Sequence, residues 1–283
     1  MSSNSNPIIV SIMMPVYNGL PLIKASVESL INQTYQNWEC IVIDDGSDDG
    51  TSQYLDTLAD PRFKIFSQEN KGRPIARQRA LDLASGKYLA MLDAGDLYHP
   101  EKLERQVLLL ESRLEISLVT TSMCSFGMKS NLIYIRGVEN TMEEIFDGNN
   151  HPTHAPSLLR MDKAKLCRYN PNLKLGEDQD FLEKYLSRGD RFVHLSNVYY
   201  YYSELDSVSK DKIRKNYYLF ALKYFRERKY KRAVVFSLKY IYSLLFFPFI
   251  TIDKILSQRG RHPSTKEQEQ YDKYCKELVN KCL

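Results

Sequence analysis

Residues 40–50 read CIVIDDGSDDG, an apolar run that stops abruptly at two acids and a turn. Consecutive apolar residues before Asp44 are typical of a strand that is buried on both faces of a parallel sheet. Open α/β sheets bind their ligands at the carboxyl ends of such strands. The stretch therefore predicts an α/β fold that brings the carboxylates of Asp44 and Asp45 to a ligand-binding edge.

A second stretch of the same kind follows. Residues 88–92 read YLAML and run into Asp93, Ala94, Gly95 and Asp96. Two acid-tipped strands in one domain indicate a site for a polyhydroxylated ligand, or for a phosphate-bearing ligand with a bound metal. Asp, Gly and Ser are also ordinary turn formers, so each stretch alone leaves a purely structural interpretation open.

Strands and helices alternate in the first part of the chain. The expected strands are residues 8–14, 38–44, 63–67 and 88–92, and the expected helices are residues 22–33, 52–58, 74–84 and 100–112. The first strand is expected to end at Pro15, and Thr51 is the expected N-cap of the second helix. This alternation predicts βαβ units and a mainly parallel sheet with helices on both faces.

Further strands are expected at residues 116–126, 132–137, 157–160 and 192–202, with helices at residues 141–146 and 177–187. Residues 151–157 are expected to form a loop. The pattern then turns helical and basic near residues 203–210. We therefore expect an α/β domain over residues 1–209 and a helical tail over residues 210–283.

Charge divides along the same boundary. Residues 1–209 carry 21 Lys and Arg against 28 Asp and Glu, whereas residues 210–283 carry 18 against 7, so the overall +4 conceals −7 and +11. This asymmetry predicts an acidic globular part and a basic tail that binds an anionic surface. The five cysteines lack CxxC or zinc-like spacing, and residues 1–10 lack the features of a signal peptide. Both observations favour a cytoplasmic protein with reduced thiols.

Seven short motifs give the chain a family resemblance. They are SIMMPVYN at residues 11–18, SLINQTYQNWE at 29–39, DDGS at 44–47, NKG at 70–72 with Ala76 and Arg77, GKY at 86–88, DAGD at 93–96 and GED at 176–178. Each is weak alone. In this order and spacing, over residues 8–209, the chain resembles the inverting family 2 glycosyltransferases of the GT-A fold.

The resemblance implies a nucleotide-diphosphate sugar as donor. The residues that match the donor site are Pro15, Val16, Tyr17, Asn18, Asp45, Arg77, Asp93 and Ala94. The ring of Tyr17 would stack on the base, and Asp45 would accept the base N–H in a charge-assisted hydrogen bond. Arg77 would lie near the diphosphate. A rim tyrosine and an exposed helical arginine are the structural alternatives for Tyr17 and Arg77.

The resemblance also implies a divalent metal, Mg²⁺ or Mn²⁺, because the family's Asp-x-Asp acids hold the ribose and a metal that bridges the phosphates. Such a cation would stabilise the charge that develops on the departing diphosphate. In this chain Gly95 occupies the usual metal-binding position, and Asp96 follows it. Three arrangements stay open: Asp96 reaches the metal, Asp93 holds it with waters, or nearby basic residues such as Lys71 and Arg73 replace much of it. We expect a metal held by Asp93 and Asp96.

Asp178 matches the catalytic base of the family. An inverting displacement needs one carboxylate that takes the proton from the acceptor hydroxyl while its oxygen attacks opposite the diphosphate. Enrichment of acids in the first turn of a helix explains residues 177–180 equally well by composition. Glu177 is expected to orient the acceptor. His154 is a candidate for the acceptor side, although a surface position is the commoner one for such a histidine.

One downstream segment departs from the family. Residues 201–209 read YYSELDSVS where family members often carry Tyr-Arg-x-His-x-x-Ser-x-Ser. Tyr202 and Glu204 replace the basic residues, whereas Ser207 and Ser209 are retained. Glu204 would repel a bare diphosphate, so either the usual phosphate contacts or the usual pose of the donor should differ in this chain.

The tail combines charge with an apolar run. Residues 210–232 hold ten Lys and Arg against two acids, and residues 240–252 carry no charge and contain Pro248. Thirteen helical residues would extend about 20 Å, short of the roughly 30 Å hydrocarbon core. We expect this segment to lie on an anionic membrane surface. The alternative is a helical subdomain that packs on the α/β domain or on a second subunit, which would give a homo-oligomer. Nucleic acid is not expected, because no recognition module accompanies the charge.

Taken together, these features predict a cytoplasmic glycosyltransferase that is peripheral on the inner face of the plasma membrane. It would transfer one sugar with inversion from a UDP-sugar to a hydroxyl of a glycan or lipid-linked acceptor in bacterial-type surface polysaccharide synthesis. One rival is a non-catalytic nucleotide-sugar-binding or scaffold protein of the same fold. Another is a different nucleotide-dependent α/β enzyme, but neither GxGxxG after the first strand nor a P-loop is present.

Overall fold

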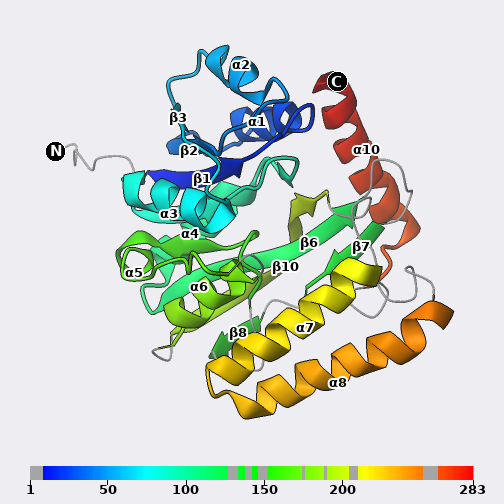
Figure 1. Cartoon of the computed structure of the whole chain (residues 1–283). Helices are drawn as coiled ribbons and strands as arrows, with labels where there is room; N and C mark the ends of the chain where they lie inside the picture. Colours follow the sequence, from blue (N-terminus) through cyan, green and yellow to red (C-terminus); the bar gives the residue numbers. More distant parts are fainter. Residues whose placement is uncertain are drawn as a thin grey trace.

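The computed structural model describes residues 9–126, 133–137, 142–145, 152–173, 176–187, 190–203, 210–250 and 261–282. Its centre is a mixed sheet in the order β3-β2-β1-β4-β9-β6-β10-β5, with β7 paired to β6 and β8 paired to β10. Helices cover both faces of the sheet, and a pair of long helices, α7 and α8, lies below it in Figure 1. The predicted α/β class with a helical C-terminal region is confirmed.

The first half of the chain folds as alternating strands and helices. Its elements are β1 (Val10–Val16), α1 (Ile23–Ile31), β2 (Trp38–Asp44), α2 (Thr51–Asp56), β3 (Phe63–Ser67), α3 (Arg73–Leu83), β4 (Tyr88–Met91) and α4 (Lys102–Ser112). The four strands are mutually parallel. The N-cap of α2 is Gly50, at φ +94°, and Thr51 is the first residue of the helix, so the expected cap is wrong by one position.

β1 continues through Pro15, contrary to the expected end of the strand. The backbone groups of successive residues of β1 point alternately toward β2 and β4. The N–H of Val10 and the carbonyl of Val16 both bond on the β2 side, so the backbone nitrogen of Pro15 faces β4. The last pair between β1 and β4 is Met13 with Met91, and β4 ends there. The missing N–H of Pro15 therefore has no ladder partner to lose, which is the condition under which a strand tolerates proline.

The second half adds antiparallel strands to this parallel set. It contains β5 (Leu97–Tyr98), β6 (Ile116–Phe126), β7 (Ile133–Arg136), β8 (Met142–Ile145), β9 (Leu158–Arg160), α5 (Met161–Ala164), α6 (Glu177–Tyr185) and β10 (Arg191–Tyr202). β9 joins β4 to β6 in antiparallel fashion, whereas β6 and β10 are parallel. The helix expected at residues 141–146 is wrong, because residues 142–145 pair with β10 instead. So short a segment gains little as an isolated helix, whereas the neighbouring strand offers it a ready hydrogen-bond ladder.

The strand alternation divides the core into two layers. Along β1, Ile12 and Met14 pack with residues of α1 and α4, whereas Met13 packs with residues of α3 and α6. This explains why the central strands are apolar without alternation, since both of their faces are covered. The five cysteines are free, and four of them are buried, in agreement with reduced thiols.

The C-terminal region is helical, but its parts pack differently. α7 (Lys210–Arg226) and α8 (Tyr230–Phe246) form an antiparallel hairpin, and η2 (Phe247–Phe249) follows it. α10 (Thr265–Cys282) instead returns to the sheet and packs on α1, where the hydroxyl of Tyr274 donates to the carbonyl of Tyr98 at 2.6 Å. The proposed domain boundary stays a prediction, because residues 204–209 lie outside the described part of the chain.

Candidate active site

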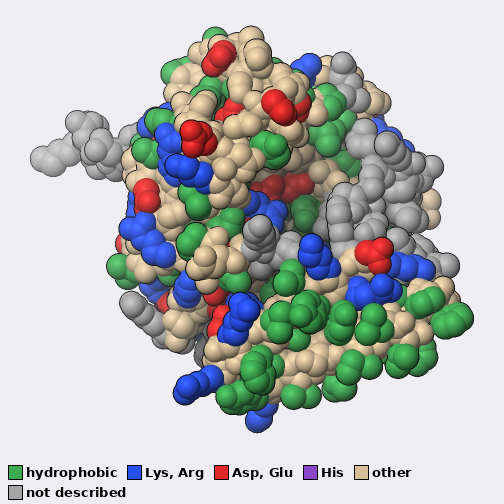
Figure 2. Space-filling view, viewed as in Figure 1, with side chains coloured by type: hydrophobic (Ala, Val, Ile, Leu, Met, Phe, Trp, Pro, Cys, Tyr) green, Lys and Arg blue, Asp and Glu red, His purple; other side chains and the backbone are tan. Residues whose placement is uncertain are grey.

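Three neighbouring strands bring predicted site residues to one edge of the sheet. Tyr17 follows β1, Asp45 follows β2, and Asp93 lies two residues after β4. Because these strands are parallel, their carboxyl ends lie together. The face drawn in Figure 2 is hollowed near its centre, and acidic and basic side chains gather in the hollow.

Asp45 shapes the loop that begins α3. Its carboxylate accepts hydrogen bonds from the backbone N–H of Lys71 and Gly72, at 2.9 and 2.8 Å, and from the amide of Gln68 at 2.7 Å. Gly72 has φ +87° and ψ 157°, a conformation open essentially to glycine alone. The buried carboxylate therefore fixes the start of the helix that carries Arg77. Contact of Asp45 with a base stays a prediction.

Arg77 lies between two carboxylates. Its Nη2 donates to both oxygens of Asp93, at 2.8 and 2.7 Å, and its Nη1 donates to Glu177 at 2.9 Å. The side chain is only 4% exposed, so the alternative of an exposed helical arginine does not apply. Burial lowers the pKa of Arg77, but the charges of Asp93 and other acidic neighbours outweigh it, so the net shift is upward and the guanidinium stays protonated. The cluster thus keeps one fixed positive charge next to Asp93.

Asp93 is the more accessible carboxylate of this cluster. Its side chain is 27% exposed, whereas that of Glu177 is fully buried. Burial raises the pKa of Asp93, but the charges of Arg77 and Arg73 outweigh this effect and lower the pKa below its ordinary value. Asp93 therefore carries its negative charge at neutral pH and can accept further ligands from the open side. Glu177 is enclosed by Arg73 and Arg77 instead, so its expected contact with an acceptor has no open path here.

Asp178 is the second residue of α6 and lies near the same cluster. Its charge contributes to the pKa shifts of Arg77, His154 and Tyr169. Its Oδ1 accepts from the backbone N–H of Gln179 at 2.8 Å, and its Oδ2 has no hydrogen-bond partner among the described residues. The side chain is half-buried. A partly exposed carboxylate with an oxygen free of protein partners is placed as a general base requires.

His154 is buried rather than on the surface, so the commoner position considered for it is wrong. Its Nε2 lies 2.7 Å from the hydroxyl of Tyr169, and its ring meets those of Tyr169 and Phe181 edge-on. Burial, and after it the charge of Arg77, lowers the pKa of His154 to about 3, although Asp178 and Asp93 act in the opposite direction. The imidazole is therefore neutral at physiological pH and lies within the field of the site.

Asp96 has a structural role, which leaves it poorly placed as a metal ligand. Oδ2 accepts from the hydroxyl of Tyr200 at 2.6 Å, and Oδ1 accepts from the backbone N–H of Ser203 at 2.9 Å. Burial and the nearby charge of Asp93 raise the pKa of Asp96 to about 8. Among the described residues no group of three His, Cys, Asp or Glu side chains could hold a metal. The donor set fits only a cation that uses one protein carboxylate, Asp93, and takes its remaining ligands from a substrate and water.

The glycosyl transferase family 2 model matches residues 11–160. This match spans more than half of the chain and includes the three strand ends described above. The chain belongs to glycosyl transferase family 2. The predicted family and enzyme class are thereby confirmed.

Relatives and solved structures agree with this assignment. The family 2 chain is 44% identical over 100 residues to the UDP-Glc:alpha-D-GlcNAc-diphosphoundecaprenol beta-1,3-glucosyltransferase WfgD of Escherichia coli, a match that covers 35% of this chain and 40% of that protein. It is 37% identical over 159 residues to the putative teichuronic acid biosynthesis glycosyltransferase TuaG of Bacillus subtilis, covering 55% and 56%. It matches S. aureus TarS in complex with UDP-GlcNAc with a TM-score of 0.63 at 20% identity, covering 96% and 82%. The curated matches thus span about half or less of those two proteins, and the structural match shows the fold.

The remaining donor residues of this family 2 chain are placed as follows. Pro15 and Val16 are buried in β1, and Ala94 is half-buried. Tyr17 is 53% exposed, which leaves its ring open to solvent at the strand end. Asn18 joins the two strand-end turns, since its Nδ2 donates to Asp48 and its Oδ1 accepts from the backbone N–H of the same residue. Contacts of these residues with a donor stay predictions.

Some site residues were missed by the sequence reasoning. Tyr169 bonds to His154 and stacks on Phe181 with ring centroids 4.4 Å apart, but it lies in a segment without a motif. Tyr200 holds Asp96 from a strand rich in tyrosine, where alternation could have indicated that it faces away from its two neighbours. Of the segment that departs from the family, Tyr202 ends β10, whereas the replacement at Glu204 and the retained Ser207 and Ser209 lie outside the described residues.

Proposed function

We propose that the chain transfers a sugar, with inversion, from a UDP-sugar to a hydroxyl of a glycan or lipid-linked acceptor in surface polysaccharide synthesis. The observation that carries the proposal is the free Oδ2 of Asp178 beside the cluster of Asp93 and Arg77. The relatives WfgD and TuaG, by their names, support the substrate class, and the TarS complex with UDP-GlcNAc supports the choice of UDP.

In this mechanism Asp178 removes the proton from the acceptor hydroxyl as its oxygen attacks the anomeric carbon. The bond to the diphosphate breaks on the opposite face, so the configuration inverts in one step. The fixed positive charge of Arg77 would stabilise the negative charge that grows on the diphosphate, and His154, with its pKa lowered to about 3, adds no positive charge to the site at neutral pH. Asp93 and Glu177 hold Arg77 in place from two sides.

We also propose that Asp93 would hold a divalent cation when a donor is bound. Such a hard cation would supply extra stabilisation of the leaving diphosphate. The test is UDP affinity measured by calorimetry with and without Mn²⁺. Mn²⁺ should tighten binding to the native protein and have little effect on Asp93→Asn. An equal effect on both proteins would remove Asp93 from this role.

The base is tested by Asp178→Asn, with Asp162→Asn as a matched control. Asp162 is also an acid in the first turn of a helix, and its Oδ1 accepts from the next backbone N–H at 2.9 Å, as that of Asp178 does. Asp178→Asn should reduce transfer by a factor of roughly 100 to 10,000, the usual contribution of a general base, while UDP binding persists. Asp162→Asn should leave both unchanged. Undiminished turnover in Asp178→Asn would refute the assignment, and absence of transfer in the native protein with any nucleotide sugar would favour the scaffold alternative.

We further propose that α8 lies on an anionic membrane surface. Within the described part of the chain, Tyr230–Phe249 alone is long and apolar enough to cross a membrane, with a mean hydropathy of 1.3. Lying on the surface is favoured because Lys239 is in the middle of the segment and α7 covers one side of it. Exposed apolar side chains cover a broad face of this segment, and one row at helical spacing consists of Val234, Leu238, Ile241, Leu245 and Phe249. Figure 2 shows hydrophobic side chains along this part of the molecule with basic side chains beside them.

Vesicle sedimentation tests this surface. Leu238→Glu/Leu245→Glu should abolish binding to vesicles that contain phosphatidylglycerol, because it places two charges in this apolar row. Leu108→Glu is the control, because Leu108, Leu238 and Leu245 are each 60% exposed but Leu108 lies on α4. Equal binding of both variants would exclude α8 as the membrane contact. A dimer in solution that the double variant dissociates would indicate the homo-oligomer instead.

A further inference from the structure

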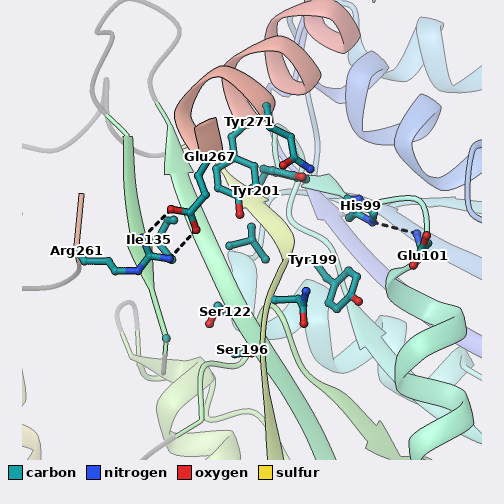
Figure 3. A pocket seen from close by; sticks show the side chains of 14 residues that line it. His99, Glu101, Ser122, Ile135, Ser196, Tyr199, Tyr201, Arg261, Glu267 and Tyr271 are labelled. Atoms are coloured by element: carbon teal, nitrogen blue, oxygen red, sulfur yellow. Dashed lines mark hydrogen bonds and ion pairs between the residues drawn. The ribbon is translucent and has the colours of Figure 1, made fainter. Parts of the chain in front are cut away.

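A cavity of about 670 Å³ lies between α10 and the end of β10, and Figure 3 shows the side chains of the 14 residues that line it. None of the candidate active-site residues is among them. Its volume lies within the range of roughly 300–1,000 Å³ that is usual for small-molecule sites. The cavity is therefore large enough for a ligand of its own.

An irregularity in β10 opens this cavity. The register between β10 and β6 shifts between Leu195 and Val198 and again between Val198 and Tyr200. On the other edge of β10, β8 pairs with residues 191–194 and β5 with residues 200–201, and the carbonyl of Tyr199 accepts from the N–H of His99 at 3.0 Å, so residues 195–198 have no partner there among the described strands. Bulges of this kind redirect side chains out of the regular pattern. Ser196, Asn197 and Tyr199 from this irregular part of β10 all line the cavity.

The charged groups of the cavity already have partners. Arg261 forms a bidentate ion pair with Glu267, at 2.9 and 2.7 Å, as Figure 3 shows. Glu101 pairs with Arg105 at 2.9 Å. Because these charges are compensated within the protein, the cavity offers no unpaired charge among the described residues for an anionic or cationic ligand.

Several neutral polar groups of the cavity, in contrast, have no hydrogen-bond partner among the described residues. They include the side chains of Ser196, Asn197 and Gln270. The same holds for the hydroxyls of Tyr201 and Tyr271, although these residues are only 1% and 9% exposed. Neither hydroxyl is among the buried polar atoms that lack a partner, so both oxygens stay accessible and can form hydrogen bonds with water or with a ligand in the cavity.

We propose that this cavity is a second site for a neutral carbohydrate, namely a sugar unit of the glycan on which the enzyme acts. Aromatic rings present an apolar face to the C–H side of a sugar, and hydroxyl and amide groups match its hydroxyls. Pairing of every charge in the cavity explains why the ligand is an uncharged sugar rather than a nucleotide. The inference rests on the proposed function for the source of the glycan, but the binding itself does not require transfer.

The test is saturation-transfer NMR with neutral mono- and trisaccharides of glucose, galactose, mannose and N-acetylglucosamine, recorded with the full chain and saturating UDP. At least one sugar should bind in the presence of UDP. Asn197→Ala/Gln270→Ala removes two exposed groups at the cavity and should weaken that sugar's binding about 25-fold, since each neutral hydrogen bond contributes about 1 kcal/mol, or about five-fold. Tyr201→Phe should weaken it about five-fold, whereas the control Tyr218→Phe, on the exposed side of α7, should not.

Three results would overturn the second site: no sugar of the panel binds, the double variant binds as the native protein does, or UDP displaces the sugar. Donor turnover is measured on the same native sample. Turnover without sugar binding in the presence of UDP would reject the cavity and leave the proposed function intact. Sugar binding that depends on Asn197 and Gln270 without turnover of any donor would support the cavity and count against the transferase activity.

Discussion

Removing Arg77 or Glu177 singly should destabilise the fold almost as much as removing both. Their charged atoms lie 2.9 Å apart, and the side chains are 4% and 0% exposed. With an effective dielectric constant of about 20, the attraction at this distance is about 6 kcal/mol. Desolvation offsets much of it. Among the described residues, Arg77→Met leaves the buried Glu177 with only the half-exposed Arg73 as a charged partner. Glu177→Gln leaves Arg77 with only Asp93. Losing one partner of a buried pair costs about 3–5 kcal/mol.

The double-mutant cycle uses Arg77→Met and Glu177→Gln. Each single variant should lower the free energy of unfolding by about 3–4 kcal/mol, and the double variant by about 4–5 kcal/mol, which gives a coupling of about 2–3 kcal/mol. Urea unfolding followed by tryptophan fluorescence suits this measurement, because Trp38 is the single tryptophan and is buried in β2.

A surface pair provides the matched control. Arg168 and Asp82 are closer, at 2.6 Å, but their side chains are 65% and 49% exposed. Their coupling, from Arg168→Met and Asp82→Asn, should be below about 1 kcal/mol and should fall in high salt. If the buried pair showed a coupling no larger than that of the exposed pair, burial would not govern the energetics of the cluster, and the argument that Glu177 fixes Arg77 would fail.

Three further results are expected. Lys102 is fully buried, and burial lowers its pKa to about 7. Because Lys102 of the unfolded state keeps its proton up to about pH 10, the free energy of unfolding should rise between pH 7 and 10. Lys102→Met should add about 2 kcal/mol to the free energy of unfolding at pH 7 and abolish this rise. His154 has its pKa lowered to about 3 by burial and by Arg77, so stability should fall as the pH drops below about 6.5; urea unfolding at pH 7 and 4.5 should show a loss of about 2–3 kcal/mol that His154→Gln lacks. Glu183→Gln should speed proteolysis between α7 and α8, because Glu183 accepts from Lys229 and Arg232, both at 2.8 Å; an unchanged cleavage rate would argue against this anchor.

The strand ends could be predicted because their signals are local. An apolar run followed by Asp44 and Asp45 specifies a buried strand and a turn without reference to the rest of the chain, and the same holds for the run before Asp93. The parallel order of β1, β2 and β4 then follows from the helices between them. The position of the predicted donor residues at one edge was therefore accessible from sequence.

The partners of the charged residues were not accessible in this way. Asp96 was expected to hold a metal, but its hydrogen-bond partner Tyr200 lies 104 residues away. Arg77 was expected near the diphosphate or as an exposed helical residue, whereas it is buried between Asp93 and Glu177, and Glu177 lies 100 residues further along the chain. Pairs of residues that are distant in the sequence decide which polar side chains are buried. The periodicity of a single helix or strand carries no information about such pairs.

Some of the basic residues of the tail form ion pairs with α6. Part of the positive charge of the tail is used within the molecule, because Lys229, Arg232 and Lys223 face Glu183 on α6. Asp178 is the second residue of the same helix, and Phe220 of α7 lies against its N-cap Gly176, where an added Cβ would meet the ring at 2.6 Å. α6 thus contacts the hairpin at both of its ends. If α8 binds a membrane, the hairpin contacts would transmit this binding to α6, the helix that positions the proposed base. Anionic vesicles should therefore change the transfer rate of the native protein more than that of Glu183→Gln.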